Sequence, residues 1–268
     1  MIKLQSTHAL RWGIWVCALS AVVLGCSNPQ PSDVPTVVIL GAASTKDLLE
    51  EISAAAEDSL DGAVKIEIST GPSHALAQQI LSGAPADLYV SANRKWAEAI
   101  EAADMASESV DWLANRIVVI VPAKSELKIN SLEDLTSDQV KRVAIAGENV
   151  PAGIYAKQAL SYYELWEPLN ASGKIIRGHD VRSTLAYAER GEVDAAIVYA
   201  TDARLTDQVR VIAELEPDSH SPVVYPLVKL RSAAYAPKQV YQFYLSDAAR
   251  KIAESYGFQA LSTAKGKE

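Results

Sequence analysis

Short apolar runs alternate with helix-like segments along most of this 268-residue chain. The apolar runs predict buried strands, and apolar residues spaced three or four positions apart predict helices. Such alternation is typical of open α/β sheets with parallel strands. The expected strands are residues 37–40, 64–68, 87–90, 117–121, 143–146, 195–199, 209–212 and 224–230. The expected helices are residues 44–58, 74–82, 151–163, 180–190, 236–245 and 247–256.

One helix start stands out in the run Val150-Pro151-Ala152-Gly153, which follows the apolar run 143–146. Proline suits the first helical position, where its missing N–H costs nothing. Ala152 and Gly153 are small, so they leave the free amides of the first helical turn open. Open amides at a helix start favour an anion.

Three more helix starts follow strands in the same way, and a tyrosine ends a buried strand. The helix starts are Ala42-Ala43-Ser44, Gly71-Pro72-Ser73 and His179-Asp180-Val181, and the tyrosine is Tyr199. In open α/β sheets, ligands bind at the carboxyl ends of the strands. Hydroxyls, helix-start amides and a phenol that converge there would surround a small oxyanion with donors.

The N-terminus predicts export and a lipid anchor. Lys3 and Arg11 precede a short apolar stretch that is too short for a comfortable membrane span, so residues 1–25 are expected to be a signal peptide. Val23-Leu24-Gly25-Cys26 resembles a bacterial lipobox, which makes Cys26 the lipidated first residue of the mature chain. Ordinary signal cleavage near this point is the alternative. Residues 26–35, rich in proline and polar residues, are the expected tether.

Charge and cysteine content exclude several classes of protein. The net charge is −8, and it becomes −10 without Lys3 and Arg11, so nucleic acid is not an expected partner. Cys17 leaves with the signal peptide and Cys26 carries lipid, so no disulfide or thiol chemistry is expected in the mature chain.

Two other site types have little support in the sequence. Ser73-His74 could form a nucleophile and base of a serine hydrolase or phosphatase, but adjacent loop residues rarely face each other, and no G-x-S-x-G elbow, P-loop or G-x-G-x-x-G fingerprint occurs. A metal site built from His179, Asp180 and His220 has no metal-type spacing to support it.

Several motifs together resemble the molybdate-binding proteins of bacterial ABC transporters, in order from residue 37 to residue 258. These motifs are 42–44, 83–87, 150–160, 189–192, 197–199 and 256–258. The resemblance implies an α/β protein with the two-lobed, class II periplasmic-binding-protein fold. Each lobe would be an open, mostly parallel sheet flanked by helices, with the ligand cleft between lobes. Lobe one would hold residues 36–116 and 225–268, and lobe two residues 117–224.

The resemblance also implies the ligand donors, all of them through hydrogen bonds and none through direct metal coordination. They are the hydroxyls and amides of Ser44 and Ser73, the amides of Ala152 and Val181, and the hydroxyl of Tyr199. One departure from the family lies at Pro72-Ser73-His74, where relatives usually show consecutive serines. Here Pro72 removes one N–H, and His74 adds a bulky ring at the helix start.

The function implied is capture of molybdate, and also tungstate, for delivery to an ABC permease. The protein would be a monomer without enzymatic activity or cofactor, lipid-anchored on the periplasmic or cell-surface side of a bacterial membrane. Another oxyanion such as sulfate is the alternative ligand. By itself, Ser44 followed by Asp47 predicts only a helix cap, and Tyr199 only a core tyrosine. Asp87 and Asp202 are expected to be structural, satisfying loop amides.

Overall fold

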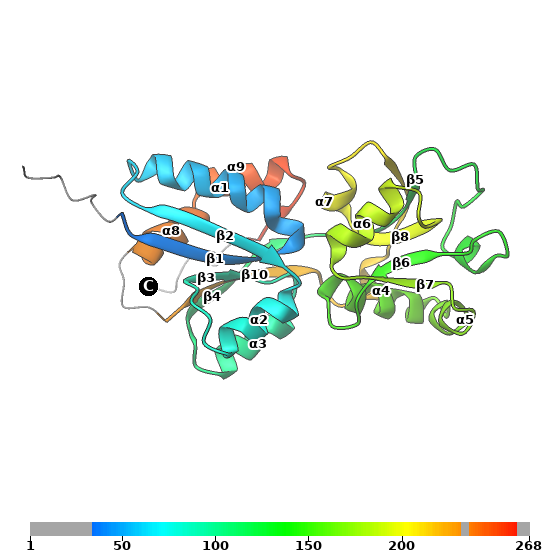
Figure 1. The fold of residues 1–268 in the computed structure, drawn as a ribbon, viewed down its shortest axis with the longest axis horizontal. Helices are drawn as coiled ribbons and strands as arrows, with labels where there is room; N and C mark the ends of the chain where they lie inside the picture. The colour runs from blue at the N-terminus through cyan, green and yellow to red at the C-terminus, as the bar shows by residue number, and fades with distance from the viewer. Residues whose placement is uncertain (1–33, 232–235, 262–268) are drawn as a thin grey trace, which may run out of the picture. The chain divides into compact units, whose positions relative to one another are not determined.

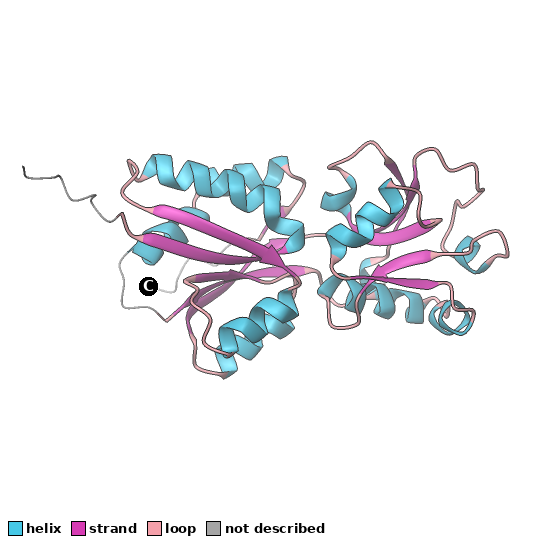
Figure 2. Ribbon diagram, viewed as in Figure 1, coloured by secondary structure: helices cyan, strands magenta, loops and turns pink. Residues whose placement is uncertain are grey.

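The computed structural model describes residues 34–231 and 236–261 (Figure 1). The predicted signal peptide, Cys26 and most of the tether lie outside these ranges. Within them, no helix combines the length and the apolar character that crossing a membrane requires. Two separate sheets form the framework, and Figure 2 shows helices on both faces of each sheet.

The first sheet has the strand order β11-β4-β10-β3-β1-β2. Its strands are β1 (Thr36–Ala42), β2 (Lys65–Gly71), β3 (Leu88–Val90), β4 (Ala106–Ala114), β10 (Val224–Leu230) and β11 (Gln259–Ala260). Helices α1 (Lys46–Ser59), α8 (Ala236–Tyr244) and α9 (Asp247–Ser255) cover one face, and α2 (Ser73–Leu81) and α3 (Arg94–Ala102) cover the other (Figure 1). Alternate residues of β1 enter two different cores, with Ile39 in one and Leu40 in the other, as a strand buried on both faces requires.

The second sheet has the order β7-β6-β8-β5-β9. Its strands are β5 (Ile117–Pro122), β6 (Val143–Ala146), β7 (Ile175–Gly178), β8 (Ala195–Tyr199) and β9 (Val209–Glu214). Its helices are α4 (Pro151–Tyr162), α5 (Trp166–Ala171), α6 (Val181–Glu189) and the short α7 (Ala200–Ala203). Three 3₁₀ turns, η1 (Ala43–Thr45), η2 (Glu133–Thr136) and η3 (Pro217–Ser219), lie in the connections.

Both sheets are mixed, so the expectation of mostly parallel sheets is wrong. β1, β2 and β3 are parallel, as are β6, β7 and β8, but β10 is antiparallel to β3 and β4, and β5 is antiparallel to β8 and β9. The reason is the path of the chain, which passes between the sheets between β4 and β5 and again between β9 and β10. A strand that arrives from the other sheet begins where the parallel strands of its new sheet end. It therefore runs antiparallel to them.

Most elements expected from the sequence are present, and a few were not expected. β6, β8 and β10 have the predicted bounds, whereas α3, β4, α5 and β7 were not predicted. The lobe boundaries stay a prediction. Val224, expected in lobe two, pairs with Ala114 in the first sheet.

Candidate functional site

The carboxyl ends of strands from both sheets meet at one small cavity, which we call the inter-sheet cavity. It is a partly open hollow of about 210 Å³, a volume that includes space continuous with solvent. All five residues expected to bind the ligand line it: Ser44, Ser73, Ala152, Val181 and Tyr199. The other lining residues are Ala42, Ala43, Gly71, Pro72, Ala92, Val150, Pro151 and Asp180. The structure therefore brings together residues that are far apart in the sequence, and Asp180 carries the one carboxylate among the lining residues.

Ser44 lies in η1, directly after β1, and it is buried. Its predicted role as the helix cap is wrong: Thr45 occupies the N-cap position of α1, and no side-chain cap bond forms there. The Ser44 hydroxyl instead lies 3.0 Å from the Tyr225 hydroxyl on β10. Tyr225 also accepts a long hydrogen bond (3.4 Å) from the Asn115 amide, which favours Tyr225 as the donor to Ser44. The proton of Ser44 is then available to the cavity.

Ser73 is the first residue of α2 and is also buried. Its Oγ accepts a hydrogen bond from the Ala92 amide at 3.0 Å, and its carbonyl accepts one from the Tyr89 hydroxyl at 2.8 Å. A hydroxyl has one proton and two acceptor lone pairs, so Ser73 Oγ, which already accepts from the Ala92 amide, still has its proton to donate. Pro72, where relatives usually have a serine, does not displace Ser73 from the cavity, since both residues line it.

Ala152 and Val181 contribute the starts of two helices. Ala152 is the second residue of α4 and Val181 the first of α6, so their amides have no acceptor within their own helix. Asp180 caps α6 as predicted: its carboxylate accepts from the Ser183 amide at 2.7 Å. The amides of both helix starts, with the positive ends of their helix dipoles, face an acceptor placed in the cavity.

Gly153 allows α4 to start this close to the sheet. A Cβ at this position would lie 2.2 Å from the Gly147 carbonyl oxygen and 2.4 Å from that of Ala146. Real Cβ atoms do not approach backbone oxygens so closely, so any side chain would push the helix start away from β6. The small size of Gly153 thus also lets the first amides of α4 lie close to the end of β6.

Tyr199 ends β8, and its side chain is fully buried. Its hydroxyl has no hydrogen-bond partner in the described part of the chain, although its ring lies against that of Tyr225 with centroids 5.7 Å apart. Burial, reinforced by the neighbouring Tyr225, raises the pKa of the Tyr199 phenol well above its usual value of 10. The group is therefore a neutral donor at physiological pH.

The sequence reasoning missed one charged cluster beside the cavity. Arg182, which follows Val181, lies between two carboxylates: its Nη2 is 2.7 Å from Asp47 Oδ2, and its Nε is 2.8 Å from Asp202 Oδ1. Burial raises the pKa of Asp202 to about 7, against the opposing charge of Arg182. Asp202 was expected to satisfy loop amides, but in the described chain it pairs with the side chain of Arg182 instead. Asp87, the other predicted structural acid, accepts from the Val38 amide at 2.9 Å.

The rival site types find no support in the geometry. The Ser73 hydroxyl accepts a hydrogen bond from the Ala92 amide. The His74 ring is not part of the cavity lining and packs near Trp96, with the two ring centroids 6.0 Å apart. Across residues 34–231 and 236–261, no group of three or more histidine, cysteine or acidic residues could hold a metal ion.

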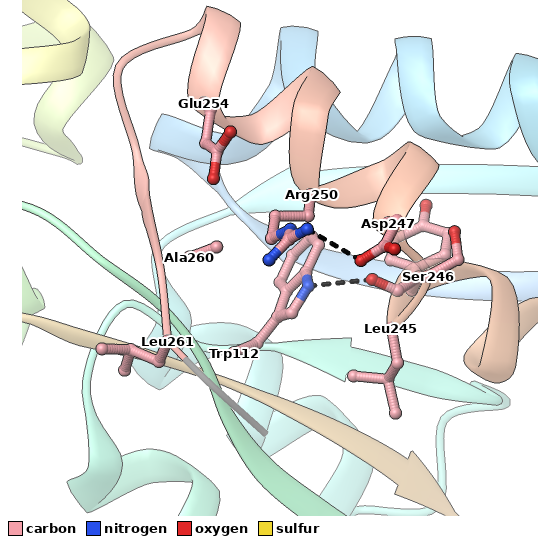
Figure 3. Close-up of a pocket in the computed structure, with 9 residues that line it drawn as sticks. Trp112, Leu245, Ser246, Asp247, Arg250, Glu254, Ala260 and Leu261 are labelled. Carbon is pink, nitrogen blue, oxygen red and sulfur yellow. Dashed lines mark hydrogen bonds and ion pairs between the residues drawn. The ribbon is translucent and has the colours of Figure 1, made fainter. Parts of the chain in front are cut away.

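Another pocket, beside α9, is a poor anion site (Figure 3). Trp112 and Tyr244 form part of its wall, with the Trp112 indole donating to the Tyr244 carbonyl at 2.9 Å. Its single cation, Arg250, pairs with Asp247 at 2.9 Å, and Glu254 adds a second carboxylate. The net negative charge of this pocket disfavours an anion.

Comparison with known proteins agrees with the fold. A Bacillus subtilis protein named as an ABC transporter substrate-binding lipoprotein, YvgL, is 38% identical over 93% of this chain and 98% of its own length. The molybdate-binding protein ModA of Haemophilus influenzae is 36% identical over 84% of this chain and 90% of its own. The structure of the periplasmic molybdate-binding protein of Azotobacter vinelandii matches with a TM-score of 0.73, at 21% identity, over 83% of this chain and 98% of that one.

These similarities confirm the resemblance to molybdate-binding proteins and the two-lobed periplasmic-binding-protein fold. The sequence also matches the family described as bacterial extracellular solute-binding protein over residues 37–259. Since this match spans both sheets, the chain belongs to the bacterial extracellular solute-binding protein family.

Proposed function

We propose that this protein binds molybdate, and also tungstate, in the inter-sheet cavity and delivers it to an ABC permease. The observation that carries the proposal is the convergence of Ser44, Ser73, Ala152, Val181 and Tyr199 on one small cavity. These residues come from both sheets and offer only neutral O–H and N–H donors. The molybdate-binding proteins among the relatives support the choice of anion.

The direction of the hydroxyl protons supports a fully deprotonated dianion as the ligand. Ser73 Oγ already accepts from Ala92, and Tyr225 is placed to donate to Ser44 Oγ, so both serines have their proton left to give. Molybdate can accept from every one of these groups. Hydrogen phosphate carries a proton that needs an acceptor, and a buried donor left unpaired costs about 1–3 kcal/mol.

Asp180 is the residue that could weaken this discrimination. It lines the cavity, and its Oδ1 is used by the Ser183 amide. Its other oxygen would be the first acceptor for a protonated anion. Sulfate carries no proton, so only the fit of the smaller ion in the cavity can disfavour it.

Calorimetric titrations at neutral pH with molybdate, tungstate, sulfate and phosphate test the proposal. We expect tight binding of molybdate and tungstate, weaker binding of sulfate, and much weaker binding of phosphate. Absence of molybdate binding would refute the proposed ligand. Phosphate binding that matches molybdate would mean that an acceptor operates in the cavity, and Asp180→Asn would then identify it.

The cellular setting forms part of the same proposal. We propose that Cys26 is lipidated and that the mature chain is a monomer, without catalytic activity, held on the periplasmic or cell-surface side of a bacterial membrane. A relative named as a lipoprotein supports the anchor. Cys26→Ser should release the protein from the membranes of its host and leave molybdate binding by the purified protein unchanged. Retention of the variant in the membrane fraction would contradict the anchor.

A further inference from the structure

Arg182 lies on α6, which packs on the second sheet, but it contacts residues of η1 and α1 beside the first sheet. Its Nη2 lies 2.7 Å from Asp47 Oδ2 on α1 and 3.3 Å from the Ser44 carbonyl oxygen, to which it donates. Its Nε lies 2.8 Å from Asp202 Oδ1 on α7. We propose that Arg182, Asp47 and Asp202 form an inter-sheet clasp that sets how long the bound anion is retained. The inference rests on the proposed function for its ligand.

The clasp joins the two helix starts between which the anion would lie. Val181, directly before Arg182, and Ser44, three residues before Asp47, both line the inter-sheet cavity. An anion held by groups on both sheets favours the arrangement in which these helix starts face each other. The Arg182–Asp47 pair joins the same two helix starts, so its free energy adds to that closed, ligand-bound state.

Asp202 fixes the guanidinium for this role. Its side chain is fully buried, whereas the side chains of Arg182 and Asp47 are 26% and 37% exposed. The Nε and Oδ1 atoms are close, but the N–H is not well aligned with the oxygen, so this contact is an ion pair more than a directed hydrogen bond. Asp202, on the same side as Arg182, thus pairs with the guanidinium at Nε. Asp47, on the side of the first sheet, pairs with it at Nη2.

The charge state of Asp47 agrees with this pairing. Burial by itself would raise the pKa of Asp47, but the hydrogen bond and charge of Arg182 together hold it below its usual value. Neither Arg182 nor Asp47 lines the cavity, so the clasp makes no direct contact with a ligand there. These are positioning residues, and their effect should appear in dissociation more than in association.

Two hydrogen bonds between residues of the two sheets are uncharged. The Trp96 indole donates to the Asn149 carbonyl at 3.2 Å, and the Tyr155 hydroxyl donates to the Ala92 carbonyl at 3.3 Å. Salt screens a partly exposed ion pair but has little effect on such hydrogen bonds. The part of the salt dependence of dissociation that is lost when Asp47 is replaced therefore reports on the clasp.

The test measures molybdate dissociation by stopped flow at low and high salt in the wild type, Asp47→Asn and Asp47→Ala. We expect both variants to release molybdate about two- to fivefold faster, the range for a partly exposed pair, with nearly unchanged association. The wild-type rate should rise with salt and the variant rates should not. Glu50→Gln is the matched control, because Glu50 pairs with Lys46 within α1 and does not reach the other sheet. Its rate should equal that of the wild type.

A ligand-free measurement separates failure of the clasp from failure of the proposed function. Spin labels at the exposed residues Gln79 and Glu167 report the distance between the sheets. We expect Asp47→Ala to shift the distribution to longer distances at low salt. Absence of molybdate binding by the wild type would refute the proposed ligand. The distance distributions would then test on their own whether the clasp holds the two sheets together. Asp47 variants with wild-type dissociation rates, or with wild-type distances if no ligand binds, would overturn it.

Discussion

Replacing Tyr199 with phenylalanine should weaken anion binding without destabilising the fold. In the described chain the Tyr199 hydroxyl is buried without a partner, so its removal breaks no hydrogen bond within the protein. A bound dianion would accept from it, and a charge-assisted hydrogen bond is worth about 1.5–3 kcal/mol. The affinity for molybdate should therefore fall about ten- to a hundredfold. The free energy of unfolding without ligand should stay unchanged or rise by up to about 1 kcal/mol, because a buried unpaired polar group is lost.

Tyr244→Phe is the matched control for this change. Tyr244 is as fully buried as Tyr199, but its hydroxyl bonds to Ser53 at 2.7 Å, far from the inter-sheet cavity. This variant should lose about 1 kcal/mol of stability and keep its affinity for molybdate. Urea denaturation without ligand gives the first quantity, and calorimetric titration gives the second. Wild-type affinity in Tyr199→Phe would refute the placement of this hydroxyl on the anion. Destabilisation like that of Tyr244→Phe would mean that the hydroxyl has a partner in the protein.

Three further changes test other parts of the site. Ser73→Ala should weaken molybdate binding about ten- to a hundredfold and also destabilise the protein, since the Ala92 amide loses its acceptor; unchanged calorimetric affinity would remove Ser73 from the site. Gly153→Ala should cost about 1–3 kcal/mol in urea denaturation and weaken binding, because its Cβ would meet the Gly147 and Ala146 carbonyl oxygens; a variant of wild-type stability and affinity would show that α4 can shift freely. The raised pKa of Asp202, about 7 against 3.8 in the unfolded chain, means that the folded state binds the extra proton, so this residue lowers stability as pH rises from about 4 to about 7. Asp202→Asn should therefore lose less unfolding free energy than the wild type between pH 5 and pH 8, and equal losses would show that Arg182 keeps Asp202 charged throughout.

The sequence by itself determined the local structure around the cavity. Apolar runs marked β6 and β8 to the residue, and the pattern of Pro151 and the small residues after it marked the start of α4. Asp180 was recognisable as a cap because capping depends on groups within one turn of the helix. Through the family motifs, the sequence also singled out five residues that line one cavity.

Only the tertiary structure decided which side chains serve each other across the chain. Ser44 resembled a helix cap, yet its hydroxyl bonds to Tyr225, 181 residues away. β4 escaped prediction because four of its nine residues are exposed and polar, and pairing with β10 holds it in the sheet. The same holds for Arg182, whose partners Asp47 and Asp202 lie on different elements. Sequence patterns encode backbone preference and periodic burial, which are local, whereas partners brought together by the crossing of the chain between two sheets leave no local pattern to read.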